Sequence, residues 1–326
     1  MRPVSWSQRR VLVTGATGII GSWLVKELLR RDAHVVALVL DADPGSEMSR
    51  SGDIDRVEVV HGALEEYPIL DRSLAQHNID TVFHLGAQTI VGTAHSSPLS
   101  TFESNIRGTY NLLEACRVHA DTVKAVVVAS SDKAYGEQSV LPYTEDMTLA
   151  GQHPYEVSKS CADMVAQAYH WTYALPVGIA RCGNVYGGGD LNWSRIVPGT
   201  IRSLLEGKRP IVRSDGAYVR DYIYVKDVVD GYISLAEGLL RDEVKGEAFN
   251  FGNERPVTVL ELVRQIQAVL DCMDLEPEIV NTAKGEIRSQ YLSVEKARDL
   301  LRWRPSFDPE QGLRETVDWY RGYLAL

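Results

Sequence analysis

The chain has 326 residues, of which 44% are hydrophobic and 24% charged, and it carries a net charge of −10. This composition is typical of globular proteins and excludes collagen-like and disordered chains. Proteins that bind duplex nucleic acid usually present a basic face, so the acidic balance argues against a nucleic-acid partner. No apolar run approaches the roughly 20 residues that span a bilayer, and no secretory signal precedes Val11. We therefore expect a cytoplasmic protein with no membrane partner.

Short β-branched runs alternate with amphipathic stretches through the first half of the chain. The expected strands are Val11–Thr14, Val35–Leu40, Val57–His61, Thr81–Leu85, Val123–Ser130 and Val177–Arg181. The expected helices are Ile19–Arg31, Ser97–His119 and Tyr155–Tyr173. Strands that are apolar on both faces and alternate with helices predict an α/β fold with a doubly wound parallel sheet.

The pattern loosens after Cys182, where the elements are shorter and interrupted by prolines. One further strand–helix pair, Tyr222–Val225 and Asp227–Leu240, indicates that the sheet pattern returns. We therefore predict a sheet domain from residues 1–182 and 221–252. Residues 183–220 and 253–326 are expected to form a second, smaller domain of mixed α/β structure.

A glycine-rich turn follows the first expected strand and opens the first expected helix. Gly15 permits a tight turn, Gly18 lets a pyrophosphate approach the backbone, and Gly21 lets the helix pack closely on the strand. The N–H groups at the start of the helix can then hold the phosphates of a dinucleotide. The alternative is a purely structural turn.

Asp41 lies 20 residues beyond Gly21, at the end of the second expected strand. A carboxylate there can accept hydrogen bonds from both ribose hydroxyls and repel a 2′-phosphate, which favours NAD over NADP. The alternative is that Asp41 is a loop carboxylate without contact to the cofactor.

Tyr155 and Lys159 form a YxxxK pair within an expected helix. Positions i and i+4 share a helix face, so the Lys159 charge is expected to lower the pKa of the Tyr155 phenol from its usual value of about 10. Such a phenol can take a proton from an alcohol while hydride leaves the same carbon. Ser130 and Ser131 end the preceding strand, where a hydroxyl can share that alcohol oxygen. The alternative is an unrelated surface Tyr and Lys.

The motifs together resemble the extended short-chain dehydrogenase/reductase family that acts on nucleotide sugars. They cover nearly the whole chain in the family's order: TGATGIIG at Thr14–Gly21, HLGAQ at His84–Gln88, Asn105 in NIRGT, SSDKAYG at Ser130–Gly136, YEVSK at Tyr155–Lys159, RCGNVYGGGD at Arg181–Asp190 and VRDYIYVKD at Val219–Asp227. The resemblance implies that the sheet domain is a Rossmann domain that binds NAD. It also implies that the smaller domain binds a nucleotide-diphosphate sugar and that the protein is a homodimer.

The resemblance assigns site residues by position. The implied catalytic residues are Ser131, Asp132, Lys133, Tyr155 and Lys159. The implied NAD contacts are Gly15, Thr17, Gly18, Ile19, Ile20, Gly21, Asp41, Leu85, Ala87, Gln88, Asn105, Ser130, Tyr155, Lys159 and Cys182. The implied substrate contacts are Gln88, Asn184, Arg195, Arg220 and Arg288. For Arg220 the alternative is a simple ion pair with Asp221 or Asp227.

The triplet Ser131-Asp132-Lys133 carries the most information about the reaction. Simple 4-epimerases of the family have a small or hydroxyl residue after the catalytic Ser, 4,6-dehydratases have an acid, and Asp-Lys is similar to CDP-glucose 4,6-dehydratases. Dehydration across C5–C6 needs an acid for the departing C6 hydroxyl, which Asp132 can be. It also needs a base for the C5 proton, which Lys133 can be only if burial depresses its pKa. The alternative is a structural Asp132–Lys133 pair at the strand end. The chain departs from the CDP-glucose branch in its shorter length, at Ala63 and Gly92, and in the epimerase-like form of Arg220–Tyr222.

Three functions remain open at this point. The first is an NAD-dependent nucleotide-sugar 4,6-dehydratase, and the second is an NAD-dependent epimerase acting at C4 or C2. The third is a non-catalytic NAD-binding sensor or scaffold, which would not need Ser131, Tyr155 and Lys159 together.

Histidine and cysteine spacing indicates no metal site. The eight histidines form no HxxxH or HxH pair, and we expect His84 only to cap the fourth strand. The cysteines show no CxxC pair, so we expect free thiols at Cys116, Cys161, Cys182 and Cys272. The aromatic residues near the end of the chain, Trp303, Trp319 and Tyr320, are expected to lie in the hydrophobic core.

Overall fold

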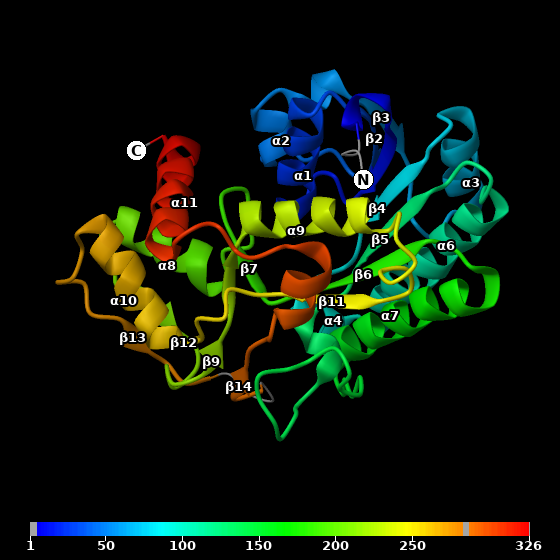
Figure 1. Ribbon diagram of the computed structural model, residues 1–326. Helices are drawn as coiled ribbons and strands as arrows, with labels where there is room; N and C mark the ends of the chain where they lie inside the picture. The colour runs from blue at the N-terminus through cyan, green and yellow to red at the C-terminus, as the bar shows by residue number, and fades with distance from the viewer. Residues whose placement is uncertain (1–4, 283–286, 326) are drawn as a thin grey trace.

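The structure, a computed structural model, describes residues 5–282 and 287–325. Seven strands form the central sheet in the order β11-β6-β5-β4-β1-β2-β3, and every neighbouring pair is parallel (Figure 1). These strands are β1 (Arg10–Thr14), β2 (His34–Val39), β3 (Glu58–His61), β4 (Thr81–His84), β5 (Ala125–Ala129), β6 (Val177–Cys182) and β11 (Ala248–Phe251). The predicted doubly wound parallel sheet is confirmed, and all six strands predicted from the first half belong to it.

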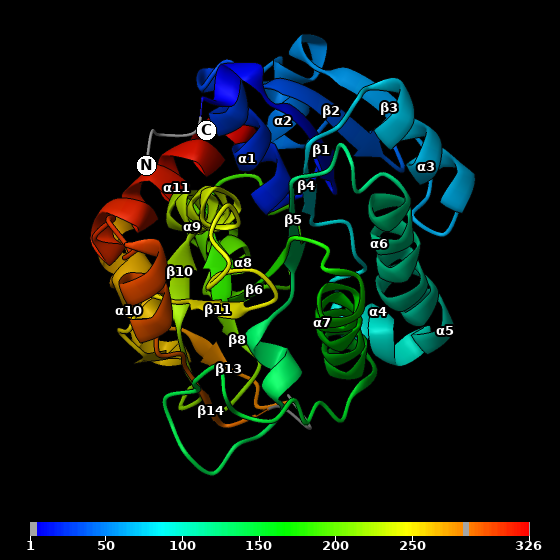
Figure 2. The same ribbon diagram turned by 45° about the vertical axis from the view of Figure 1, so that its right-hand side comes forward.

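Both faces of the sheet are buried, which explains why its strands read as continuous apolar runs. In β1, Val11 and Val13 pack into one apolar cluster, while Leu12 packs into a second cluster on the opposite face. The helices that supply these clusters lie on the two sides of the sheet in Figure 2. They are α1 (Ile19–Arg30) and α9 (Val225–Gly238) on one face, and α3 (Tyr67–Gln76), α6 (Gly108–Val118) and α7 (Pro154–Tyr173) on the other.

The strand order reverses at β1, which pairs with β2 on one side and with β4 on the other. Crossovers leave such a point in opposite directions, so a crevice opens beyond the carboxyl ends of the strands. The residues that follow β1, β4, β5 and β6 therefore meet at one edge of the sheet.

A smaller part of the molecule packs beside that edge around its own apolar cluster. Its short sheets pair β10 with β7, β9 with both β12 and β14, and β13 with β8. Its strands are β7 (Asn184–Tyr186), β8 (Ile211–Val212), β9 (Val219–Arg220), β10 (Tyr222–Tyr224), β12 (Val257–Thr258), β13 (Glu278–Ile279) and β14 (Ser289–Gln290). Its helices are α8 (Ile196–Leu205), α10 (Val259–Leu270) and α11 (Pro309–Leu324).

The predicted return of the sheet pattern at Tyr222–Val225 is wrong for the strand. β10 pairs with β7 outside the central sheet, and its Tyr222 and Tyr224 belong to the smaller cluster. The following helix α9 does cover the central sheet, and β11 is the strand that completes it. Residues from Val294 to Trp303 also pack into the core of the central sheet, although they fall within the predicted smaller domain. The domain limits stay a prediction. The structure differs from them in two places: β10 pairs outside the central sheet, and residues 294–303 pack into the core of the central sheet.

The helix predicted over Ser97–His119 contains a wider π-helical turn. It runs as α5 (Pro98–Phe102), a π segment η3 (Glu103–Arg107) and then α6. Such an extra residue in a helix redirects the side chains of that turn, here including Asn105.

The remaining short elements connect these layers. They are η1 (Trp6–Gln8), α2 (Glu47–Arg50), η2 (Asp53–Arg56), α4 (Val91–Ser96), η4 (Asp132–Tyr135) and η5 (Ala297–Leu301). Over residues 5–282 and 287–325, no helix combines the length and apolar character needed to cross a membrane.

Candidate active site

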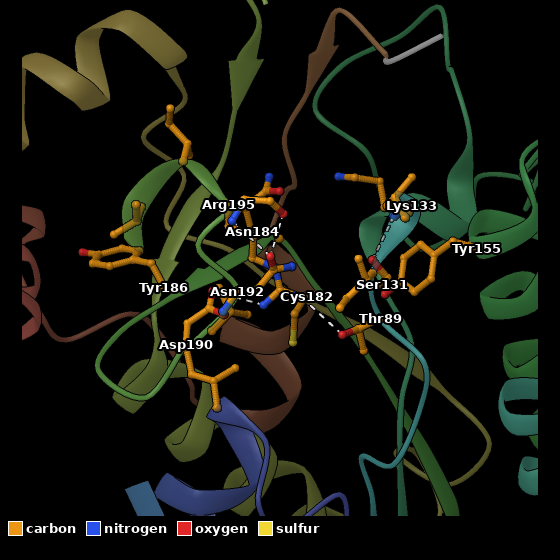
Figure 3. A pocket seen from close by; sticks show the side chains of 18 of the residues that line it. Thr89, Ser131, Lys133, Tyr155, Cys182, Asn184, Tyr186, Asp190, Asn192 and Arg195 are labelled. Carbon is orange, nitrogen blue, oxygen red and sulfur yellow. Dashed lines mark hydrogen bonds and ion pairs between the residues drawn. The ribbon is translucent and has the colours of Figure 1, made fainter. Parts of the chain in front are cut away.

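A cavity of about 1080 Å³ lies at the carboxyl edge of the central sheet, between that sheet and the smaller part (Figure 3). It brings together most of the predicted site residues from separate segments. Those in its wall are Gly15, Thr17, Gly18, Ile19, Ile20, Gly21, Leu85, Ala87, Ser130, Ser131, Asp132, Lys133, Tyr155, Lys159, Cys182, Asn184, Arg195 and Arg220. Four predicted site residues do not line it: Asp41, Gln88, Asn105 and Arg288.

The glycine turn has the geometry of a dinucleotide cradle. Gly15 has a φ of +67°, and a Cβ there would lie 2.7 Å from the Gly86 nitrogen. A Cβ on Gly21 would lie 2.1 Å from the Gly15 oxygen, so α1 packs against the turn as predicted. The start of α1 forms part of the cavity wall, which places its unpaired N–H groups where a pyrophosphate can bind. Ser130 adds a buried hydroxyl that has no hydrogen-bond partner in the described chain. These features fit NAD.

Asn105 and Gln88 are occupied by protein contacts. The Asn105 Oδ1 accepts from Gln88 N at 2.7 Å, and its Nδ2 donates to Gln88 O and to Ser158 Oγ, each at 2.9 Å. The Gln88 side chain folds back onto Ile90 and Thr101. Asn105, from the π segment, thus fixes the loop after β4, and direct contacts of Asn105 and Gln88 with NAD or substrate stay a prediction.

Asp41 and Arg288 lie outside the cavity wall. Asp41 follows β2 on the surface and is exposed, so its contact with a ribose stays a prediction. The Arg288 side chain is 67% exposed and pairs with Asp215 at 3.4 Å. Its backbone carbonyl, in contrast, accepts from Arg220 Nη1 at 3.2 Å.

Ser131 and Tyr155 meet in the cavity, as Figure 3 shows. Burial raises the pKa of Tyr155 to about 12, Asp132 adds to the rise, and Arg195 and Ser131 oppose it. The prediction that Lys159 lowers this pKa is wrong in this geometry. The Lys159 Nζ donates to Ala129 O at 2.9 Å, and burial lowers the pKa of Lys159 itself to about 8.

Asp132 and Lys133 form an ion pair in the cavity wall. The Lys133 Nζ lies 3.1 Å and 3.2 Å from the two Asp132 oxygens, and Ser131 Oγ donates to Asp132 Oδ1 at 3.1 Å. The Asp132 side chain is 2% exposed and that of Lys133 is 22% exposed, so this is not a solvated surface pair. Burial lowers the pKa of Lys133, and a pKa lowered by burial is what the sequence analysis required for Lys133 to act as a base.

Cationic side chains approach from the smaller part. Arg195 is the N-cap residue of α8, and its guanidinium binds Asp190 Oδ2 at 3.1 Å and Thr89 Oγ1 at 3.3 Å. Arg220 is only 7% exposed and donates to Val219 O at 2.9 Å. Asn184 follows β6 and lies beside Arg195 in Figure 3. All three side chains line the cavity.

The sequence analysis missed many residues of the cavity wall, among them Thr89, Trp193, Arg213 and Gln290. Thr89 could have been found, because it directly follows the HLGAQ segment. Gln290 has no motif around it, and only the pairing of β14 with β9 brings it to the site.

His84 has the structural role that was expected. It is 3% exposed, with Nδ1 2.9 Å from Thr14 Oγ1 and Nε2 2.9 Å from Thr109 Oγ1, so it ties β4 to β1 and α6. Burial lowers its pKa to about 3, with a smaller contribution from the Lys159 charge. Among the residues that the structure describes, no group of three or more His, Cys, Asp or Glu side chains is arranged to hold a metal ion.

Comparison with known sequences identifies the family. Residues 11–252 match the model of the NAD dependent epimerase/dehydratase family. The chain is 31% identical to CDP-glucose 4,6-dehydratase of Salmonella typhimurium, over 98% of this chain and 92% of that protein. It is 32% identical to a dTDP-glucose 4,6-dehydratase of Streptomyces antibioticus, over 97% of this chain and 93% of that protein.

Solved structures agree in fold over nearly the whole chain. A UDP-glucose 4-epimerase from Thermotoga maritima, with UDP-glucose, superposes with a TM-score of 0.87 at 29% identity, covering 97% of this chain and 99% of that one. A dTDP-glucose 4,6-dehydratase from Streptomyces venezuelae, with NAD bound, gives 0.85 at 30% identity, covering 96% and 97%. With the glycine cradle and the Ser131–Tyr155–Lys159 set in one cavity, these matches show that the chain belongs to the NAD-dependent epimerase/dehydratase family of extended short-chain dehydrogenases/reductases and is an enzyme that uses NAD.

Proposed function

We propose that this enzyme is a nucleotide-sugar 4,6-dehydratase. The observation that carries the proposal is the buried Asp132–Lys133 pair, which lies in the cavity wall directly after Ser131. A 4-epimerase needs a proton acceptor at C4 only. Elimination across C5–C6 also needs an acid and a base next to that acceptor, and Asp132 and Lys133 are placed to be both.

The diphosphate of the substrate is held by the smaller part in this proposal. Arg195 and Arg220 supply the cations, and Asn184 supplies an amide donor. Arginine forks two donors onto a phosphate, and the N-terminus of α8 adds its dipole from the same side. The Thermotoga maritima relative with UDP-glucose supports this class of ligand.

Tyr155 begins the reaction as a phenolate, a form that burial disfavours and the Arg195 charge favours, and takes the proton of the C4 hydroxyl, whose oxygen Ser131 holds. NAD, when bound, accepts the hydride from C4 and later returns it at C6. The resulting 4-ketone of the sugar acidifies the proton on C5, because the carbanion formed there is delocalised onto the ketone oxygen.

The Asp132–Lys133 pair then moves two protons. In this proposal one proton passes from the Lys133 ammonium to the Asp132 carboxylate, which gives a neutral amine and a carboxylic acid. Lys133 takes the C5 proton while Asp132 gives its proton to the C6 hydroxyl, which leaves as water. The ion pair is thereby regenerated. When hydride returns to C6, the Lys133 ammonium gives its proton back to C5, and the proton that Tyr155 took from the C4 hydroxyl passes through solvent to restore the Lys133 ammonium.

The second candidate is an epimerase, favoured by the UDP-glucose 4-epimerase fold match and by the epimerase-like Arg220-Asp221-Tyr222 segment. Product mass separates the two. A panel of UDP-, GDP-, CDP- and dTDP-sugars is incubated with enzyme and NAD, and the products are read by mass spectrometry. A dehydratase product lacks one water and an epimerase product has unchanged mass. NAD binding without any product would favour the non-catalytic alternative.

We also propose that two copies pair through the helices on the α6–α7 side. These helices pack on each other and carry exposed apolar side chains, namely Leu99, Tyr110, Val118, Met164, Trp171 and Tyr173. An exposed patch of this kind is typical of a protein interface. Trp171→Asp should convert the sedimenting species to a monomer, while Met273→Asp, at an exposed site beyond α10, should not. A wild-type monomer would contradict the proposal.

A further inference from the structure

Gln290 has an unusual position for a residue of the smaller part. Its side chain is fully buried, yet it forms part of the cavity wall beside Asp132 and Lys133. The Gln290 Nε2 donates to Asp132 O at 2.8 Å, and its Oε1 accepts from Lys133 Nζ at 2.6 Å. One amide therefore binds the backbone of one member of the pair and the side chain of the other.

The Lys133 ammonium is surrounded by three acceptors. These are the two Asp132 oxygens at 3.1 Å and 3.2 Å, and the Gln290 Oε1 at 2.6 Å. An ammonium has three N–H donors, so this set occupies all of them. Asp132 is the adjacent residue in the chain, whereas Gln290 lies 157 positions away and is held by a different sheet.

The strand that carries Gln290 is tied to the residue proposed to bind phosphate. β14 pairs with β9 in parallel, and Gln290 is in register with Arg220. The Arg220 guanidinium also donates to the Arg288 carbonyl, two residues before Gln290. On the other side, Tyr143 N donates to Tyr291 O at 2.9 Å, and Ser293 N donates to Tyr143 O at 2.9 Å. The position of Gln290 is thus set by both the smaller part and the loop after η4.

We propose that Gln290 is a positioning residue for the reaction, which aligns Lys133 with Asp132 and makes this alignment depend on the strand that carries Arg220. The proposal rests on the dehydratase function above. The amide suits this task because its oxygen accepts from the ammonium without taking its proton and without adding charge. A carboxylate at the same place would compete with Asp132 for Lys133.

Two substitutions separate the contact from the charge. Gln290→Met keeps the length of the side chain but removes both hydrogen bonds, so Lys133 loses an acceptor that stabilises its charged form. Gln290→Glu keeps an acceptor and adds a negative charge. The pair needs one labile proton to act, so loss of that proton from Lys133 limits the rate at high pH. We expect the alkaline limb of the kcat profile to move to lower pH in Gln290→Met and to higher pH in Gln290→Glu.

Gln267→Met is the matched control. Gln267 is also fully buried, its Nε2 donates to the carbonyls of Cys272 and Leu275, and its Oε1 accepts from Arg264, but it lies in α10 away from the cavity. We expect kcat to fall about 10- to 100-fold in Gln290→Met, with KM changed far less, and to stay at the wild-type value in Gln267→Met. Thermal unfolding of both variants measures any common loss of stability.

A double-mutant cycle tests whether Gln290 acts through Lys133. In a Lys133→Met background, Gln290→Met should cost no further rate, because the group that it positions is gone. Three results would each overturn the proposal. The first is an additive loss of rate in the Lys133→Met background, and the second is an equal kcat for the Gln290→Met and Gln267→Met variants. The third is an alkaline limb that moves in the same direction in both Gln290 variants. The wild-type product mass is read in the same assay. A product of unchanged mass would refute the dehydratase function itself, whereas a dehydrated product with an unaffected Gln290→Met variant would refute only the role of Gln290.

Discussion

Asp132→Asn is the substitution that tests the proposed chemistry most directly. It keeps the size and polarity of the side chain but removes the charge and the transferable proton. In the structure this carboxylate is 2% exposed, accepts from Lys133 and Ser131, and lies in the cavity wall. The first step, transfer of the C4 hydroxyl proton to Tyr155, does not use Asp132. Elimination at C5–C6 does.

The expected magnitude follows from what the side chain does. A positioned general acid contributes about 10²–10⁴-fold, or about 2.7–5.4 kcal/mol at 1.36 kcal/mol per decade. The variant also loses a hydrogen bond between charged groups, which costs about 1.5–3 kcal/mol of folding stability. The Lys133 side chain is 22% exposed and keeps Gln290 as an acceptor, so we expect the lower end of that range.

Rapid mixing of the variant with NAD and substrate provides the assay. NADH absorbance should rise and persist, and mass spectrometry should detect a 4-keto sugar that keeps its C6 hydroxyl. Asp227→Asn is the control, because Asp227 is also 2% exposed and accepts from Ser306 N at 2.7 Å but does not line the cavity. That variant should lose stability and turn over normally. If Asp132→Asn eliminates water at the wild-type rate, Asp132 is structural and the epimerase function replaces the dehydratase.

Two other substitutions test separate parts of the site, and a third tests a buried residue of the fold. Tyr155→Phe removes the proton acceptor and should lower turnover by about 10²–10⁴-fold in a steady-state assay, while a cofactor titration shows nearly unchanged NAD affinity; near-normal turnover would rule out this role. Asp41→Ala should weaken NAD binding much more than NADP binding by fluorescence titration, and an unchanged preference would mean that Asp41 is a loop residue. The pKa of His84 is about 3 in the fold and near 6.5 when unfolded, so the unfolded chain binds a proton first as pH falls. Stability should therefore fall between pH 6.5 and 3, by up to about 1.4 kcal/mol per pH unit from this group; urea unfolding should show a weaker slope in His84→Gln, and an identical slope would contradict the assigned pKa.

Local features of this chain were predictable because they depend on neighbouring residues. The glycine turn at Gly15–Gly21 follows from the conformational freedom of glycine and from the strand and helix on either side. The alternation of β-branched runs and amphipathic stretches predicted the doubly wound sheet, because strands buried on both faces must be apolar throughout. His84 was also correctly judged to be structural.

The prediction failed where the answer depended on a distant partner. Tyr222–Tyr224 reads as a strand of the central sheet, but whether it pairs with β7 or with β6 depends on how the chain crosses between the two parts. The effect of Lys159 on Tyr155 was inferred from helix spacing, yet burial dominates the pKa of the phenol. Spacing along a helix gives the face of a side chain, but not its solvent exposure or its other partners.

The sequence by itself determined the fold class, the dinucleotide cradle and the family, because each depends on contiguous motifs whose residues interact over short distances. Only the tertiary structure decided which side chains complete the site. Asn105 binds the loop after β4 instead of lining the cavity, and Gln290 reaches Lys133 from 157 residues away. The physical reason is that such contacts arise from the packing of separate sheets and helices, so no local pattern of residues predicts them.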